Sequence, residues 1–383
     1  MSKVIINICQ NFHDIRSDFR SLFEQAGKAS GVFLSRQWFH NLAATASQAK
    51  ESLRIYGASS DGRPTLILPL CHDAQDNPLR PRILRAHANF YTSFFSPLAA
   101  GWDQSSRQSL ESVIQAIAAE TPRWDIIDLH PMAPDSAPYQ DLRQALRRAG
   151  MAVQEYFCFG NWYLEVAGRS YREYFDGLPG KLRSTIQRKT RQLEKSGRAR
   201  IEILTDTKDT EQAIAAWEQV YRSSWKQPEA YPGFMPGLIR TCAREGWLRL
   251  GLLHIDGKPA AAQLWIVCHG TASIYKLAYD EKFAAYSPGT VLTAHMMQHA
   301  IDIDRVREVD YLTGDDTYKR DWMSHRRERH GIMAFNLRTA QGMLAAGRHI
   351  GGRAAKGLGT RIAERFRKIG SANESCRAPD VAE

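Results

Sequence analysis

The stretch IYKLAYDEKFAAYSPGTVLTAHMM, residues 274–297, decides the fold of this chain. Its first seven residues alternate in character from one position to the next, which predicts a strand. Ser287 is a suitable N-cap residue, and Pro288 fits the first position of the helix that follows. Gly289 carries no side chain, and no acidic residue stands in the first turn. The start of this helix can therefore bind an anion, although an ordinary capped core helix is the alternative interpretation.

The composition indicates a soluble globular protein. The chain has 383 residues, enough for two domains, with 43% hydrophobic and 24% charged residues. No apolar run approaches the roughly 20 residues that a membrane-spanning helix needs. The first ten residues read as a strand and not as a signal peptide, so we expect a cytoplasmic location. Six scattered cysteines without C-x-x-C spacing predict neither a disulfide framework nor a cysteine metal site.

Positive charge is concentrated in a few segments. The formal net charge is +10, and the segment Gly180–Arg200 carries eight Lys or Arg residues against one Glu. Leu182, Ile186 and Leu193 fall on one face of this segment, which predicts an amphipathic basic helix. Such a helix can bind a tRNA backbone or another polyanion, or contact an anionic membrane, or be only a solvated helix face. A second basic cluster covers residues 319–330.

The order of the predicted elements indicates two similar α/β units with a mixed α+β sheet. We expect an N-terminal unit over residues 1–158 and a C-terminal unit over residues 159–338. The boundary lies between two predicted strands, residues 151–157 and 161–167. Among the predicted helices are residues 104–119 and 211–225.

Residues 339–383 form a third segment, a basic tail. Leu358, Ile362, Phe366 and Ile369 fall on one helical face, with arginine and lysine residues around them. This pattern is typical of a short amphipathic helix that lies on a bilayer surface. The end of the tail has a composition typical of disorder.

A polar loop, TGDDTYKRDW at residues 313–322, follows the strand EVDYL. With this loop the chain resembles a known family, the branch of the GNAT superfamily that includes FemAB-type aminoacyltransferases and CelD-type acyltransferases. The resemblance rests on VFLSRQWFHNL, GKLRSTIQRKTRQLEKSG, IYKLAYDEKFAAYSPGTVL and DYLTGDDTYKRDW, which together span residues 30–329. It implies tandem GNAT-like acyl-CoA N-acyltransferase domains, of which the second holds the acyl donor.

The resemblance also implies a donor site at the start of the helix quoted above. In that site Tyr318 and Lys319 match an aromatic–lysine pair of the family, and Lys319 would contact donor phosphate or polarise the acyl carbonyl. The family's glycine-rich pyrophosphate loop is here reduced to a single glycine, which leaves coenzyme A and aminoacyl-tRNA both open as donors. The further residues expected to bind the donor are Tyr279, Ser287, Gly289 and Thr290.

Acyl transfer also needs a base for the nucleophile. Asp315 and Asp316 lie beside Lys319 in the polar loop, and we select Asp316, although a turn-capping role is the alternative for both. His87 can line the acceptor cleft, or be structural. Tyr275 and Tyr279 can flank the donor cleft, or be ordinary core aromatics of a strand, and Lys276 can be an exposed strand residue. The spacing of His295 and His299 lacks the glutamate of a zinc helix, so we expect no metal.

The sequence therefore predicts an acyltransferase that uses acyl-CoA, or a carrier-bound equivalent, as a co-substrate and holds no permanent cofactor. The expected acceptor is an amine or hydroxyl of a cell-envelope lipid or polysaccharide precursor, with peripheral contact to the inner face of the membrane through the basic tail. Two alternatives stay open. One is a Fem-like aminoacyltransferase that uses aminoacyl-tRNA, and the other is a non-catalytic basic protein that docks on RNA or membrane.

Overall fold

The computed structural model describes residues 3–47, 51–73, 77 and 79–351. The N-terminal half contains strands and helices, among them the predicted helix over residues 104–119. Their bounds are β1 Val4–Cys9, α1 Arg20–Ser30, α2 Arg36–Thr45, β2 Glu51–Ser60, β3 Arg63–Asp73, β4 Ile83–Ala86, α3 Gln104–Ala119, β5 Ile126–Met132 and α4 Ala137–Arg148. Short helical turns, η1 Ser17–Phe19 and η2 Val32–Leu34, precede α1 and α2.

The remaining elements begin with a strand of 15 residues, β6 Met151–Glu165. After it come α5 Tyr171–Asp176, α6 Gly180–Ser196, β7 Ala199–Leu204, α7 Thr210–Arg222, α8 Phe234–Arg244, β8 Leu248–Ile255, β9 Lys258–Cys268 and β10 Thr271–Tyr279. The chain continues through η3 Glu281–Tyr286, α9 Pro288–Gln298, η4 His299–Ile303, β11 Glu308–Asp310, α10 Thr317–Trp322, β12 His325–Asn336, α11 Ala340–Ala346 and η5 Gly347–Gly351.

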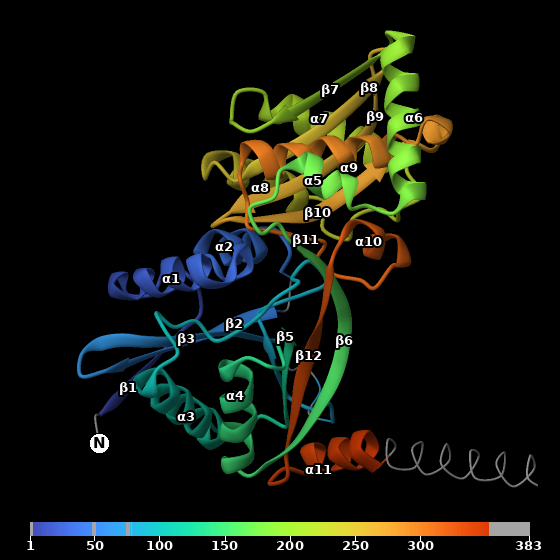
Figure 1. Ribbon diagram of the computed structural model, residues 1–383. Coiled ribbons are helices and arrows are strands. Elements are labelled where there is room, and N and C mark those ends of the chain that lie inside the picture. Colours follow the sequence, from blue (N-terminus) through green and yellow to red (C-terminus); the bar gives the residue numbers. More distant parts are fainter. Residues whose placement is uncertain (1–2, 48–50, 74–76, 78, 352–383) are drawn as a thin grey trace, which may run out of the picture.

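All these strands form one sheet, in the order β1-β2-β3-β4-β5-β12-β6-β11-β10-β9-β8-β7. The two halves of the sheet have the same arrangement. From one edge the strands are β1 to β5 followed by β12, and from the other edge they are β7 to β11 followed by β6. Parallel pairing occurs between β4 and β5 and again between β10 and β11, and the other neighbours are antiparallel. The mixed sheet of two similar halves confirms the predicted fold class (Figure 1).

Two long strands, β6 and β12, join the halves at the centre of the sheet (Figure 1). β12 pairs with β6 over its whole length and with β5 on its other side. The far end of β6 pairs with β11. The predicted boundary between residues 158 and 159 thus lies inside β6, where we expected two separate strands.

β10 pairs with β11 only at its beginning, because the short strand β11 ends at Asp310. Thr271–Ser273 face Glu308–Asp310, whereas β10 continues to Tyr279 without a partner on that side. β9 remains paired with β10 up to Tyr279, with a bulge between Ile274 and Lys276. The two strands therefore diverge after Ser273, and the gap between them is where a ligand can reach the sheet.

The apolar cores explain how the halves are held together. Phe39 of α2, Trp217 of α7 and Phe234 of α8 belong to one core on one face of the sheet, so helices from both halves share it. On the other face of the C-terminal half, α6 and α9 pack through residues such as Ile186, Leu193 and Leu292. The predicted apolar face of the basic helix is confirmed, because Ile186 and Leu193 are buried and Leu182 is partly buried.

The tail is described only as far as α11 and η5, and the predicted amphipathic face from Leu358 to Ile369 lies outside the described residues. Among the helices that the structure does describe, none combines the length and the apolar character that crossing a bilayer requires.

Candidate functional site

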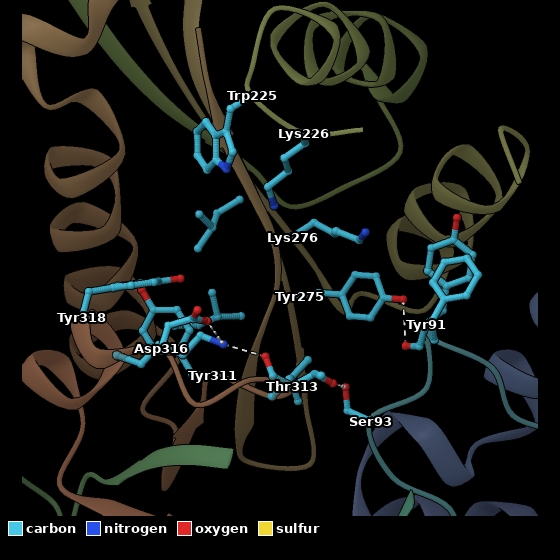
Figure 2. A pocket seen from close by; sticks show the side chains of 15 residues that line it. Tyr91, Ser93, Trp225, Lys226, Tyr275, Lys276, Tyr311, Thr313, Asp316 and Tyr318 are labelled. Carbon is cyan, nitrogen blue, oxygen red and sulfur yellow. Dashed lines mark hydrogen bonds and ion pairs between the residues drawn. The ribbon is translucent and has the colours of Figure 1, made fainter. Parts of the chain in front are cut away.

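A cavity of about 380 Å³ opens where β10 and β11 diverge (Figure 2). Its lining comes from both halves of the chain, and it combines aromatic rings with three lysine side chains. The lining residues are Phe90, Tyr91, Ser93, Trp225, Lys226, Ile274, Tyr275, Lys276, Leu277, Tyr311, Leu312, Thr313, Asp316, Tyr318 and Lys319. We call this cavity the splay pocket. It brings together Asp316, Tyr318 and Lys319, three of the residues that the sequence predicts for the site.

Lys319 is buried in the wall of the splay pocket, with 5% of its surface exposed. Its Nζ donates to the carbonyl oxygen of Thr313 at 2.6 Å and lies 3.2 Å from Oδ2 of Asp316. Burial lowers the pKa of Lys319, although Asp316 opposes that effect. The Asp316 carboxylate is 60% exposed, so it partners the buried ammonium and still faces solvent. Together they place a fixed positive charge and an accessible carboxylate at one wall.

Lys276 belongs to a second charged group, which centres on Glu229 in the loop between α7 and α8. Oε1 of Glu229 accepts from Nζ of Lys276 at 2.9 Å, and Oε2 accepts from the hydroxyl of Tyr91 at 2.6 Å. Burial acts to raise the pKa of Glu229, but hydrogen bonds from Tyr91 and Lys276 outweigh it, and the net pKa is lowered. The positive charge of Lys276 is therefore balanced by Glu229 within the pocket wall.

Lys226 differs from the other two lysines, because it forms no ion pair within the described residues. Its Nζ lies 5.9 Å from the ring centres of Tyr221 and Trp225. Burial, with repulsion from Lys276, lowers its pKa to about 8. At neutral pH the splay pocket thus carries a positive charge with no counterion in contact, which favours an anionic ligand.

The loop after β4 closes the pocket from the N-terminal half. The hydroxyls of Ser93 and Thr313 are 2.8 Å apart, and the hydroxyl of Tyr275 donates to the carbonyl oxygen of Tyr91 at 3.1 Å (Figure 2). Both hydrogen bonds join residues more than 180 positions apart in the chain. The pocket is therefore complete only when the two halves are packed together.

The predicted donor turn lies beside the splay pocket and not in its lining. Ser287 occupies the position before α9, as predicted, but it has φ 50° and its side chain makes no cap hydrogen bond. The expected capping by its hydroxyl is therefore wrong, since the left-handed backbone turns the side chain from the helix amides. The first turn of α9 contains no acidic residue. Thr290 is partly buried next to Gly289.

Aromatic contacts connect this turn with the pocket. A methyl group at Gly289 would lie 3.4 Å from Cδ1 of Tyr279. The rings of Tyr279 and Trp225 have centroids 4.8 Å apart, and Trp225 lines the pocket. The start of α9 is itself braced by buried Gln263, whose Nε2 donates to the carbonyl oxygen of Gly289 at 3.0 Å. The turn, Tyr279 and Trp225 form a continuous path from the helix start to the pocket.

Of the two residues Asp315 and Tyr318, only Tyr318 lines the splay pocket within the described part of the chain. Asp315 accepts a fork of hydrogen bonds from Arg326, at 3.0 Å and 2.7 Å, and a further bond from Nε1 of Trp162. The bonds from Arg326 lower the pKa of Asp315, so its carboxylate is committed to holding the loop. Tyr318 is 46% exposed at the pocket mouth, and burial of its hydroxyl raises its pKa to about 12.

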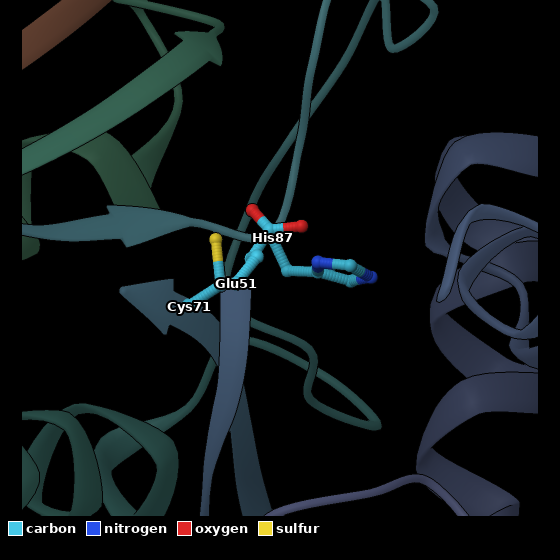
Figure 3. Close-up of side chains that lie close together, drawn as sticks. All are labelled: Glu51, Cys71 and His87. Atoms are coloured by element: carbon cyan, nitrogen blue, oxygen red, sulfur yellow. The ribbon is translucent and has the colours of Figure 1, made fainter. Parts of the chain in front are cut away.

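His87 lies in the N-terminal half and does not line the splay pocket. It is 2% exposed, its ring contacts Phe12 and Phe39, and burial lowers its pKa to about 4. Potential ligand atoms of Glu51, Cys71 and His87 lie within 4.8 Å of one another, but the imidazole extends away from Cys71 (Figure 3). Burial also raises the pKa of the Cys71 thiol. We assign no metal to this group, because a thiol that keeps its proton is a poor ligand.

Sequence reasoning missed several residues that build the pocket. Lys226, Glu229, Tyr91 and Ser93 all lie in loops, where no periodic pattern marks them. The sequence did contain one signal, since a lysine beside the tryptophan at the end of a predicted helix stands out. The helix over residues 211–225 ends instead at Arg222, which frees Trp225 and Lys226 to face the cavity.

The chain was compared with known proteins. Residues 180–320 match the family of acetyltransferase (GNAT) domains. The structure of FemX is similar to this chain, with a TM-score of 0.61 and 10% sequence identity. The alignment covers 86% of this chain and 97% of the FemX chain. The C-terminal domain of an Agrobacterium fabrum protein described as a lysylphosphatidylglycerol synthetase covers 86% and 95%, with 13% identity and a TM-score of 0.51. No curated protein matches the chain.

Proposed function

We propose that this chain is a GNAT-type acyltransferase that acylates a precursor of the cell envelope. The proposal is supported by the match of residues 180–320 to the acetyltransferase (GNAT) domain and by the similarity of the fold to that of FemX. The donor is acyl-CoA or a carrier-bound equivalent. The acceptor is an amine or hydroxyl of a lipid or polysaccharide precursor, met in the cytoplasm or at the inner face of the membrane. The single observation that carries the proposal is the splay pocket, where Lys226, which has no ion-pair partner among the described residues, and the pair of buried Lys319 with exposed Asp316 line the same cavity.

The donor side of the proposal rests on the path from α9 to the pocket. The first turn of α9 has no acidic residue and no capping side chain, so its amides suit the phosphates of a donor. Tyr279 and Trp225 line the way from there to the splay pocket. An extended donor arm fits this arrangement, with its charged end at α9 and its acyl carbonyl at Lys319.

The reaction follows from the groups in the pocket wall. The acceptor nitrogen or oxygen forms a bond to the acyl carbonyl carbon, and the bond from that carbon to the donor sulfur breaks. Lys319 stabilises the negative charge that develops on the carbonyl oxygen. Asp316 takes the proton that the nucleophile loses, and the donor leaves as a thiolate that is then protonated by water. His87 has no part in this proposal, because it is buried outside the pocket.

An apolar or partly apolar acceptor is supported by the mouth of the pocket. Phe90 is 63% exposed there, and Trp225 is 50% exposed. Exposed aromatic rings at the entrance to a site suit a ligand with an apolar portion. The basic face of α6, with Lys181, Arg188 and Arg191 exposed, is a surface that can lie on an anionic membrane.

The test is a thermal-shift titration of the whole protein with coenzyme A, acetyl-CoA and palmitoyl-CoA, followed by incubation of labelled acyl-CoA with a lipid and polysaccharide extract. We expect a thioester to raise Tm with dose, and label to move into the extract. The absence of any stabilisation by a thioester would refute acyl-CoA as the donor.

Aminoacyl-tRNA is the second candidate donor, and a specific observation favours it. Nζ of Lys189 on α6 donates to the carbonyl oxygen of Ala285, so the basic face of α6 adjoins the turn before α9. A phosphate backbone lying along α6 would reach that turn. Charged tRNA added to the same assay distinguishes the donors. Transfer from tRNA alone, with binding that weakens steeply as salt rises, would replace acyl-CoA by tRNA.

A further inference from the structure

A second cavity, of about 270 Å³, adjoins the splay pocket. The two cavities share Ser93 and Leu312 in their linings. The second cavity lies at the paired beginnings of β10 and β11, and it is lined by residues of both halves, among them Lys28, Phe94, Arg307, Arg327 and Arg329. We call it the arginine cavity. One of the shared residues, Ser93, forms the hydrogen bond with Thr313 that joins the two halves.

The acidic residues of the arginine cavity are already fully engaged. Nη2 of Arg327 lies 2.8 Å from Oε1 of Glu308 and 2.6 Å from Oδ2 of Asp310. Nε of Arg327 donates to Oδ1 of Asn161 at 2.7 Å. Oδ1 of Asp310 accepts from the side chain of Asn161 and from the backbone of Leu312. Both carboxylates therefore contact Arg327, and although their charges act on Arg329, neither accepts a hydrogen bond from it among the described residues.

Arg329 is that second arginine, two positions along the same strand and therefore on the same face of the sheet. Its Nε is buried without a hydrogen-bond partner. Its guanidinium lies 4.8 Å from the ring centre of Phe94 and forms no ion pair among the described residues. Burial, together with the charge of Arg327, lowers the pKa of Arg329 to about 10. A buried N–H without an acceptor is unfavourable, and an oxygen atom of a ligand could supply the acceptor that Nε of Arg329 lacks.

We infer that the arginine cavity binds an oxyanion group, a phosphate or a carboxylate, carried by the acceptor, and that Arg329 is its main contact. A planar guanidinium can hold such a group with two parallel hydrogen bonds. Lys28 and Arg307 add positive charge at the rim, and the side chain of Arg307 donates to the carbonyl oxygen of His269. The inference rests on the proposed function, because it places the anionic group of the acceptor in the arginine cavity, beside the splay pocket in which acyl transfer is proposed.

The test compares the wild-type protein with Arg329→Gln, Arg329→Lys and the control Arg172→Gln, whose side chain is 92% exposed. Tm is measured at constant ionic strength while chloride is replaced by inorganic phosphate or by acetate. We expect Arg329→Gln to be at least as stable as wild type in chloride, because it removes an unpaired buried charge. We also expect it to lose at least half of the rise in Tm that the favoured anion gives to wild type and to Arg172→Gln. Arg329→Lys should keep part of that rise.

The two anions tested show which oxyanion group of the acceptor the arginine cavity binds. A rise with phosphate alone indicates a phosphate-bearing acceptor, and a rise with acetate alone indicates a carboxylate. Equal responses of wild type and Arg329→Gln to both anions would overturn the inference. A parallel titration with acetyl-CoA separates this from the donor proposal. If the thioester stabilises both proteins equally while the anion effect is absent, the arginine cavity is wrong and the proposed donor stands. If the anion effect depends on Arg329 but no thioester binds, the anion site in the arginine cavity stands and the proposed acyl-CoA donor is wrong.

Discussion

Lys319 and Thr313 are joined by a hydrogen bond of 2.6 Å between the lysine ammonium and the threonine carbonyl. The same threonine places its hydroxyl 2.8 Å from that of Ser93 in the other half. The position of the buried charge is therefore set by the contact between the two halves, and not by α10 alone. A charge held in this way needs little rearrangement when an oxyanion forms beside it.

Replacing Lys319 by Met should lower kcat by about 100- to 1000-fold, as is usual when one oxyanion-stabilising donor is removed. The apolar stem keeps its packing, and Asp316 is 60% exposed and can be hydrated, so the folded state should survive. Single-turnover transfer and a thermal melt measure the two effects. Lys258→Met, at an exposed lysine, is the matched control. Activity within threefold of wild type would remove Lys319 from the mechanism.

Lys226 should make stability depend on pH in a defined interval. The unfolded chain keeps this proton up to a pKa near 10.5, whereas the folded state keeps it only up to about 8. Between these values the folded state binds fewer protons, so the free energy of unfolding from Lys226 rises as pH is raised from 8 to 10.5. Urea unfolding at pH 8 and pH 10 should show a larger gain for wild type than for Lys226→Met. Identical gains would mean that Lys226 titrates as an ordinary lysine.

Gly289→Asp should move stability and donor binding in opposite directions. An acidic residue in the first turn of α9 should stabilise the helix by about 0.3–1 kcal/mol. The same charge would repel donor phosphates, so the Tm shift by coenzyme A thioesters should fall. Gly289→Ala is the control, because a methyl group there meets only Tyr279, at 3.4 Å. An undiminished thioester shift in the Asp variant would show that the donor's phosphates lie elsewhere.

Glu229→Gln should destabilise the protein by about 1–3 kcal/mol, the usual effect of breaking hydrogen bonds to a buried charged group. The carboxylate now accepts from Tyr91 at 2.6 Å and from Lys276 at 2.9 Å, and its side chain is only 10% exposed. Urea unfolding measures the change, with the exposed Glu24→Gln as control. A loss below ~0.5 kcal/mol would mean that the network is not stabilising.

Local sequence patterns predicted much of the fold. The helix over residues 104–119 has the bounds of α3, and the strand, turn and helix of the opening stretch form β10, η3 and α9. They failed at β6, where we expected a boundary near Gly160, because pairing with β12 continues the strand through this glycine. That pairing joins residues about 170 positions apart, which no local window contains.

The residues of the candidate site were also predicted only in part. Lys319 and Asp316 were found because both lie in one short loop beside an aromatic residue. Lys226 and Glu229 were missed because their roles come from burial and from contacts with Lys276 and Tyr91, which depend on how the halves pack. His87 was selected for its chemistry alone, and packing against Phe12 and Phe39 places it outside the pocket.

The central claim, that the acyl chain of the donor enters the gap between β10 and β11, is tested most directly by photolabelling. A diazirine placed on the acyl chain of palmitoyl-CoA is activated on the protein, and the label is mapped by mass spectrometry. The account predicts label on peptides that contain Trp225, Tyr275 or Tyr311, removed by excess unlabelled palmitoyl-CoA. Label that is scattered over the surface, or not displaced by competitor, would contradict it.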